Sequence, residues 1–168
     1  MLEHAAEQAL AGVKEAGIDF VAGLPDGWQR NFQELVEQDP AVRFVPVCNE
    51  GVGFSLCAGA WLGGRKTALS MENSGLRVAS EYIARVSLGC GVPVVLLLSY
   101  RGDHGDTEHW SIPHRIVCEP LLDALRIPYQ IVRDPADLRA AIKRAHRLSE
   151  AQLHPTAVLI SGSCIWDD

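Results

Sequence analysis

The sequence contains no apolar stretch long enough to cross a membrane. Its longest apolar run, Val92–Leu98, has the length of a β-strand, whereas a membrane-spanning helix needs about 18 or more apolar residues. Basic residues are not in excess, because 15 lysines and arginines stand against 21 acidic residues and the formal net charge is −6. This balance gives no electrostatic basis for binding nucleic acid or an anionic membrane.

The sequence also lacks the C-x-x-C spacing of a zinc site or a redox pair. Its five cysteines are an odd number, are scattered along the chain and lie mostly in apolar surroundings. We therefore expect buried, free thiols in a reducing cytoplasm. The N-terminal segment, with Glu3 and His4, reads as a helix and not as a secretory signal.

Three widespread catalytic motifs are missing as well. The sequence has no Gly-x-Ser-x-Gly nucleophile motif, no Gly-x-x-x-x-Gly-Lys-Ser/Thr phosphate loop and no Gly-x-Gly-x-x-Gly fingerprint. In the segment Arg101–Trp110, the spacing of His104, Asp106 and His109 does not converge their side chains on one metal ion. The chain is therefore not expected to be a self-sufficient nucleotide enzyme, and we predict no metal site within it.

Helical and strand patterns alternate along the whole chain, without a linker or repeat. Its 168 residues, 48% hydrophobic and 21% charged, fit one globular domain, residues 1–168. Continuous apolar runs such as Pro93–Ser99 are typical of strands covered on both faces, as in a parallel sheet. We predict a doubly wound α/β fold with a mostly parallel six-stranded sheet and helices on both faces. The expected strands are 19–24, 44–48, 67–71, 93–99, 129–132 and 157–160, and the expected helices include 3–16, 29–37, 76–88 and 116–125.

Polar and glycine-rich residues follow four of these strands, in the segments 23–27, 49–51, 72–75 and 101–110. Open α/β sheets bind their ligands at the carboxyl ends of the strands, so we predict a site there. Glu50 stands out, because a glycine-rich helix with little bulk follows it up to Leu62 and would let a flat cofactor approach. The alternative is that Glu50 only complements the helix dipole, with Asn49 as N-cap.

Several of these segments together resemble the pyrimidine-binding domain of thiamine-diphosphate-dependent enzymes. The runs 46–53 and 57–66, the turn 71–76 and the segment 92–102 occur in that family's order and span nearly the whole chain. They are most similar to the α subunit, or N-terminal half, of the sulfopyruvate and phosphonopyruvate decarboxylases. The resemblance implies a flavodoxin-like fold and decarboxylation of a 2-oxo acid to an aldehyde and CO₂.

The resemblance also implies roles for particular residues. Glu50 occupies the position of the glutamate that hydrogen-bonds the aminopyrimidine ring nitrogen of the cofactor. Asn73, Ser74 and Gly75 match a turn that packs near this ring. The family holds the diphosphate and its Mg²⁺ on a second domain with a Gly-Asp-Gly motif, which this chain lacks. The resemblance thus implies a separate β subunit that carries the diphosphate and Mg²⁺, and hence a hetero-oligomer.

Substrate contacts follow from the resemblance for Asp26, Arg101 and His104. A guanidinium is a natural partner for a sulfonate or phosphonate, although Arg101 could instead form a surface ion pair with a nearby aspartate. The chain departs from the family at Glu72, where glutamine is usual, and at Arg77, where glycine is usual. An acid at position 72 would disfavour a dianionic substrate, and Arg77 could offset it. These departures leave open a substrate that is neither sulfopyruvate nor phosphonopyruvate.

Two other functions remain open at this stage. The chain could be a subunit of a thiamine-diphosphate-dependent carboligase, or a non-catalytic regulatory or assembly subunit. The small residues Gly53, Cys57 and Ala60 share a helix face, which could form a subunit interface or pack on the chain's own sheet.

Overall fold

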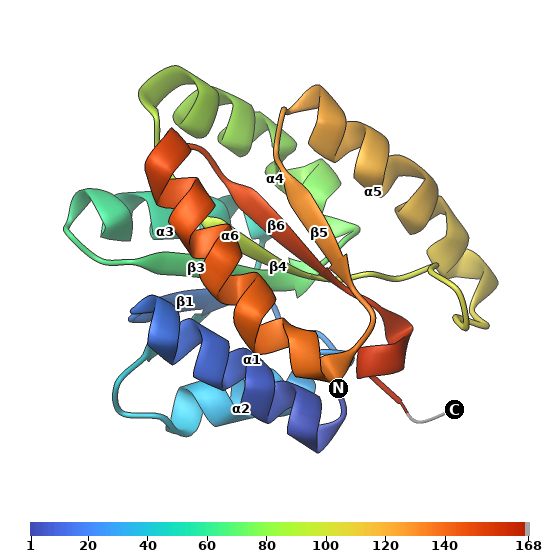
Figure 1. Ribbon diagram of the computed structural model, residues 1–168. Coiled ribbons are helices and arrows are strands. Elements are labelled where there is room, and N and C mark those ends of the chain that lie inside the picture. The colour runs from blue at the N-terminus through green and yellow to red at the C-terminus, as the bar shows by residue number, and fades with distance from the viewer. Residues whose placement is uncertain (167–168) are drawn as a thin grey trace.

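The computed structural model describes residues 1–166, and its six strands form one parallel sheet (Figure 1). The strand order is β2-β1-β3-β4-β6-β5. The strands are β1 (Phe20–Gly23), β2 (Arg43–Pro46), β3 (Thr67–Glu72), β4 (Val95–Ser99), β5 (Tyr129–Val132) and β6 (Thr156–Ile160). The α-helices of the described residues are α1 (Glu3–Ala16), α2 (Arg30–Gln38), α3 (Glu50–Leu62), α4 (Gly75–Ile83), α5 (Ile112–Ala124) and α6 (Leu138–Gln152).

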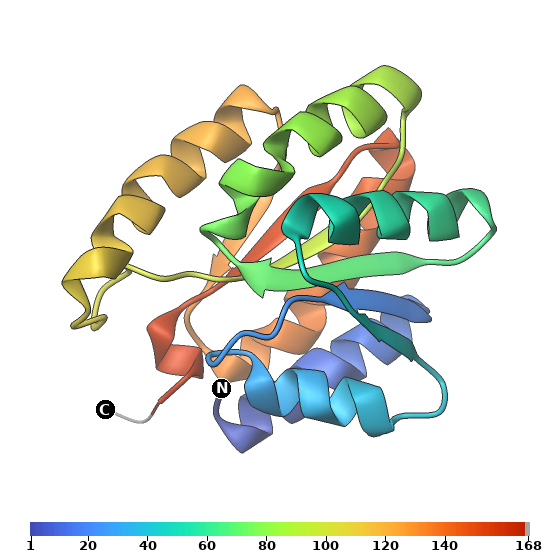
Figure 2. The ribbon, with the colours of Figure 1, turned by 180° about the vertical axis from the view of Figure 1, so that it is seen from behind.

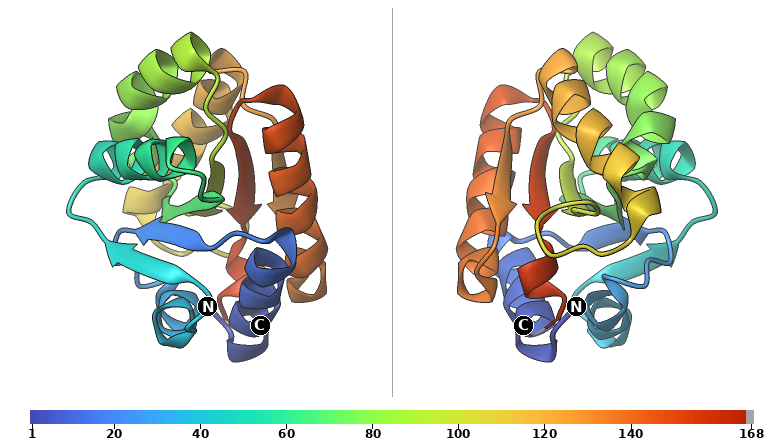
Figure 3. Two further views of the ribbon diagram at one scale, coloured as in Figure 1. Left: turned by 90° about the vertical axis from the view of Figure 1, so that its left-hand side faces the viewer. Right: turned by 90° about the vertical axis from the view of Figure 1, so that its right-hand side faces the viewer.

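The helices form two layers, one on each face of the sheet (Figure 3). Helices α1, α2 and α6 cover one face, and α3, α4 and α5 cover the other, which is toward the viewer in Figure 2. All five residues of β4 are buried, and they alternate between the layers: Val95 and Leu97 face α1, while Leu96 and Leu98 face α3 and α4. This two-sided burial is why the strand reads as a continuous apolar run. The predicted doubly wound fold is confirmed.

The structure differs from the sequence-based prediction mainly around α5. The helix was predicted to begin at Ile116, but it begins at Ile112 after a short 3-10 turn, His109–Ser111. Pro113 stands in the first turn of α5, where the missing N–H has no intrahelical partner to lose. Earlier in the sequence, the predicted helix 76–88 consists of α4 followed by a π-helical turn, Ala84–Leu88.

The cysteines are free thiols, as predicted, although not all of them are buried. Cys57, Cys118 and Cys164 are buried, and burial raises the pKa of each thiol to about 12. Cys48 and Cys90 are exposed. In the part of the chain that the structure describes, no helix has the length and apolar character needed to traverse a bilayer.

A shared carboxylate fastens α5 to the sheet. Glu119 on α5 accepts hydrogen bonds from the hydroxyls of Tyr100, which follows β4, and of Tyr129 at the start of β5, the latter at 3.0 Å. Burial and the charge of Glu119 raise the pKa of Tyr129 to about 12, and the pKa of Tyr100 rises for the same reasons. Both hydroxyls therefore stay protonated well into alkaline solution.

This contact predicts a loss of stability at alkaline pH. The pKa of Tyr129 in the folded chain lies above its unfolded value of about 10, so its contribution is complete below pH 10 and is lost as pH rises through 12. We expect the melting temperature of the wild type to fall more between pH 9 and pH 11.5 than that of Tyr129→Phe. Tyr82→Phe is the control, because Tyr82 is 41% exposed. Equal losses in wild type and Tyr129→Phe would contradict the assignment.

Candidate active site

A pocket of about 210 Å³ opens at the carboxyl ends of β1, β3 and β4. Its walls come from the loop after β1, the start of α3, the turn after β3 and the loop after β4. The pocket lies at a topological switch point of the sheet. The chain passes from β1 to β2 on one side of β1, and the next strand, β3, lies on the other side of β1. Such switch points are the usual ligand sites of open α/β sheets. The lining residues are Leu24, Pro25, Asp26, Gly27, Glu50, Glu72, Ser74 and Arg101.

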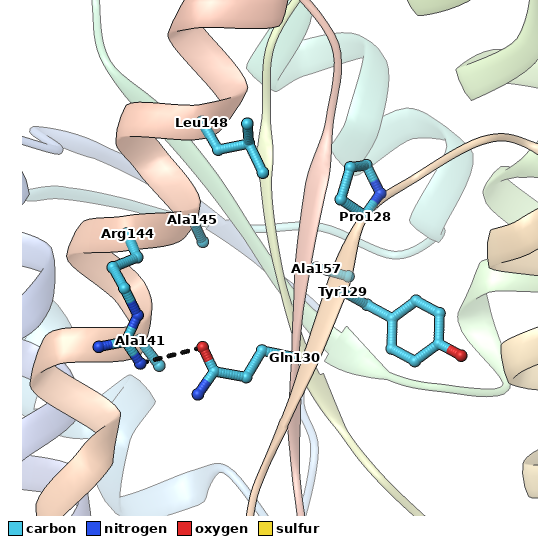
Figure 4. Close-up of a pocket in the computed structure, with 8 residues that line it drawn as sticks. All are labelled: Pro128, Tyr129, Gln130, Ala141, Arg144, Ala145, Leu148 and Ala157. Carbon is cyan, nitrogen blue, oxygen red and sulfur yellow. Dashed lines mark hydrogen bonds between the residues drawn. The ribbon is translucent and has the colours of Figure 1, made fainter.

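A second hollow of about 220 Å³ lies between α6 and edge strand β5 (Figure 4). It includes Pro128 and Tyr129 at the amino end of β5, away from the edge where the polar loops gather. Its lining contains no carboxylate, and its guanidinium, from Arg144, already donates to Gln130 Oε1 at 3.0 Å. We therefore place the candidate site in the pocket beside Glu50.

Glu50 is positioned by the cap of α3. Asn49 Oδ1 accepts hydrogen bonds from the backbone N–H groups of Gly51 at 2.9 Å and Val52 at 3.2 Å, so Asn49 is the N-cap, as predicted. A cap of this kind stabilises a helix by about 1 kcal/mol. Glu50 is half-buried in the pocket wall, and its carboxylate forms no hydrogen bond or ion pair with another residue in the range 1–166. It is free to bind a ligand.

Two glycines let α3 and α4 begin side by side. A Cβ on Gly75 would lie 2.4 Å from Glu50 Cγ and 2.7 Å from its Oε1. A Cβ on Gly51 would lie 2.2 Å from the ring of Tyr82 on α4. A side chain at position 75 would displace Glu50, and one at position 51 would displace the ring of Tyr82, so the two glycines permit the close start of these helices.

The other residues of the turn after β3 hold it in place. Asn73 is buried and its Nδ2 donates to the carbonyl of Arg101 at 3.0 Å, which joins the turn to the loop after β4. Asn73 Oδ1 has no hydrogen-bond partner among the described residues. Ser74 lines the pocket and donates to Glu72 Oε1 at 2.6 Å. Of the predicted turn residues, Ser74 alone belongs to the pocket lining.

Asp26 forms the floor of the pocket, with a side chain that is 3% exposed. Its Oδ1 accepts from the backbone N–H of Trp28 at 2.9 Å, and its Oδ2 accepts from the hydroxyl of Ser99 at 2.6 Å. Both oxygens are thus engaged inside the protein. Asp26 fastens the loop after β1 to the end of β4, and direct contact with a substrate stays a prediction.

Arg101 has two aromatic rings and two carboxylates as close neighbours. Its guanidinium lies over the rings of Trp28, 4.2 Å from the centroid, and Trp110, at 5.3 Å. Its nitrogens lie 3.7 Å from Asp26 Oδ1 and 3.4 Å from Glu72 Oε2. These carboxylates replace the nearby aspartate that the sequence suggested as a surface partner. Two stacked rings and two anions together let a guanidinium remain charged while only 12% of its side chain is exposed.

His104, the third predicted substrate residue, is exposed and lies outside the pocket lining. His114 on α5 approaches instead, with Nε2 3.6 Å from Glu72 Oε1. Sequence reasoning missed His114 because it placed the start of α5 two residues beyond it. It also missed the tryptophans that flank Arg101, since their meeting depends on how two loops fold together.

The small residues of α3 pack within the chain. Gly53 and Cys57 are buried, and a Cβ on Gly53 would lie 2.8 Å from Leu69 of β3. This contact supports the alternative in which the small-residue face lies on the chain's own sheet. Over the described residues, no group of three histidine, cysteine, aspartate or glutamate side chains is arranged to hold a metal ion.

The glycine contacts predict that Gly75→Ala will displace Glu50. The new Cβ would overlap the Glu50 side chain, which is flexible enough to swing away, so we expect a moved carboxylate in a folded protein. Gly59→Ala is the matched control on α3, because its Cβ would meet nothing within 4 Å. It should raise stability by up to about 1 kcal/mol and leave Glu50 in place. Crystal structures of both variants test this, and an unmoved Glu50 carboxylate in Gly75→Ala would contradict it.

Comparisons with known proteins identify relatives over almost the whole chain. The chain is 34% identical over 163 residues to the sulfopyruvate decarboxylase subunit alpha of Methanothermobacter thermautotrophicus, covering 97% of this chain and 99% of that protein. It is 32% identical to the subunit of the same name from Methanococcus maripaludis, covering 94% of each. Phosphonopyruvate decarboxylase of Streptomyces viridochromogenes is 30% identical over 79% of this chain and 34% of that protein. No protein-family model matches the chain.

Among solved structures, the fold is shared by 2-oxoglutarate:ferredoxin oxidoreductase from Magnetococcus marinus. The TM-score is 0.71 at 15% identity, and the match covers 99% of this chain but 30% of that one. This likeness concerns the fold. The full-length relatives establish more: this chain belongs to the family of sulfopyruvate decarboxylase alpha subunits.

Proposed function

We propose that this chain is the α subunit of a split, thiamine-diphosphate-dependent 2-oxo acid decarboxylase. Membership in the alpha-subunit family supports a decarboxylase with a second subunit. The observation that carries the proposal is the carboxylate of Glu50, which is half-buried at the switch point of the sheet and forms no ion pair with a side chain of the described residues. A carboxylate in this setting is suited to share a proton with a ring nitrogen.

The residues of the pocket fit one end of the cofactor. Glu50 would hold the aminopyrimidine ring through its nitrogen, and the bare backbone at Gly75 leaves room for the Glu50 side chain in the pocket wall. Ser74 and the buried Asn73 would support the same turn. When bound, thiamine diphosphate supplies an electron sink for the bond between the 2-oxo carbon and the carboxylate.

The reaction we assign converts a three-carbon 2-oxo acid of the sulfopyruvate or phosphonopyruvate type to an aldehyde. The bond from the 2-oxo carbon to the carboxylate breaks, CO₂ leaves, and that carbon takes up one proton. Glu50 would keep a proton in place at the cofactor ring. Asp26 and Arg101 would line the part of the pocket that receives the substrate, on the side away from α3.

The β subunit would hold the diphosphate and Mg²⁺. This assignment fits the described residues, which offer no cluster of metal-binding side chains. Helices α3, α4 and α5 cover the same face of the sheet, and α3 begins at Glu50. These helices carry many exposed apolar side chains, as expected of a surface that a partner covers. These residues are Val52, Leu56, Val78, Tyr82, Ile112, Ile116 and Val117.

The proposal predicts that Glu50→Gln abolishes decarboxylation. We expect activity from the α and β subunits together, with thiamine diphosphate and Mg²⁺, and from neither alone. Glu50→Gln should lower kcat at least about 100-fold, because an amide cannot take over proton sharing. The measurement is CO₂ release from a panel of 2-oxo acids. Glu37→Gln, on the exposed side of α2, makes the same chemical change away from the pocket and should retain the wild-type rate.

An unchanged rate in Glu50→Gln would contradict the catalytic assignment. Formation of a longer acyloin product instead of an aldehyde would point to the carboligase alternative. A complex that keeps its rate in Glu50→Gln because the β subunit has its own glutamate would point to a non-catalytic α subunit.

A further inference from the structure

The pocket contains more negative than positive formal charge. Its lining has three carboxylates, from Asp26, Glu50 and Glu72, and one guanidinium, from Arg101. If Glu50 faces the cofactor, as proposed above, Asp26 and Glu72 remain beside the single cation. The end of the substrate far from its 2-oxo acid group, here called the tail, therefore meets two anions for one cation.

Arg101 is not a free cation that could bind any anionic tail. Its guanidinium lies over two indole rings, and its nitrogens approach Asp26 and Glu72. Its Nε is buried and has no hydrogen-bond partner of good geometry among the described residues, although Glu72 Oε2 lies 3.4 Å away. An anion that enters the pocket must compete with carboxylates that already neutralise this guanidinium.

Of the two carboxylates, that of Glu72 is the more accessible to a ligand. Its side chain is 24% exposed, whereas that of Asp26 is 3% exposed and fixed by two short hydrogen bonds. Glu72 accepts one hydrogen bond, from Ser74. The charge of Glu72 therefore lies where the tail would come closest.

Arg77 does not offset this charge directly. It is exposed and lies outside the pocket lining, and its Nη2 is 3.0 Å from His114 Nδ1. A guanidinium can only donate, so we assign the lone pair to Nδ1 and the proton to Nε2, which points toward Glu72 Oε1 at 3.6 Å. The imidazole ring of His114 thus stands between Arg77 and Glu72.

We propose that Glu72 determines specificity by selecting 2-oxo acids whose tail carries a single negative charge over those whose tail carries two. The inference rests on the proposed function and names its substrate class. A sulfonate keeps one charge at every working pH. A phosphonate loses its second proton in the neutral range, at a higher pH than a phosphate ester, for which the second pKa is about 6. The subunit therefore favours sulfonates.

The test compares kcat/KM for sulfopyruvate and phosphonopyruvate in the complete αβ complex. We expect the wild type to favour sulfopyruvate at least tenfold at pH 8, with the preference shrinking toward pH 6 as the phosphonate gains a proton. Glu72→Gln should reduce the preference at pH 8 at least tenfold, mainly through faster turnover of phosphonopyruvate. Glu72→Asp retains the charge and should retain the preference. Glu7→Gln, on α1, is the matched control for loss of one carboxylate.

A binding measurement separates this inference from the proposed function. The unreactive acids 3-sulfopropanoate and 3-phosphonopropanoate can be titrated into the complex, with quenching of Trp28 and Trp110 as the signal, because both rings flank Arg101. We expect the ratio of their dissociation constants to follow the kinetic preference in each variant. An inactive complex would overturn the proposed function, and the binding ratio would still decide the charge selection.

The inference is overturned if Glu72→Gln keeps the wild-type ratio within twofold, or if neither analogue binds any variant. It is also overturned if Glu72→Asp behaves like Glu72→Gln, because side-chain length and not charge would then be responsible.

Discussion

The buried carboxylate of Asp26 is the constraint on which the pocket depends. It receives hydrogen bonds from Trp28 in its own loop and from Ser99 at the end of β4, and it lies 3.7 Å from Arg101. A buried charge is tolerated only when it is paired and hydrogen-bonded, so these contacts must form together. Gln29 extends the network by donating to the carbonyls of Met71 and Leu97 at 2.9 and 3.1 Å. The ends of three strands are thereby held in one arrangement.

Close approach of two helices supplies the second part of the site. Glycine at 51 and 75 lets α3 and α4 begin next to each other, and the Glu50 side chain occupies the space between their first turns. The Asn49 cap satisfies the N–H groups of α3 without using the Glu50 carboxylate. The dipole interpretation of Glu50 and the ligand interpretation are therefore compatible, since a first-turn carboxylate can stabilise the helix and still present its oxygens to the pocket.

The two halves of the pocket differ in how fully their polar groups are satisfied. Around Asp26 and Arg101, the charges are paired, stacked and largely removed from water. At Glu50, by contrast, no side chain of the described residues neutralises the carboxylate. Such an imbalance is expected of a site that is completed by a ligand and a second chain, because a preorganised floor fixes geometry while a free group remains for binding.

The sequence by itself determined the fold class, the place of all six strands and the edge of the sheet that forms the site, because these depend on local periodicity and on the rule for parallel sheets. It also predicted Glu50 as a candidate site residue, because Glu50 stands directly between a strand and a glycine-rich helix. Only the tertiary structure decided that Arg101 contacts the rings of both Trp28 and Trp110, that His114 reaches Glu72, and that His104 lies outside the pocket lining. These contacts join loops that are tens of residues apart, and no local pattern encodes which side chains of two loops meet when the strands align.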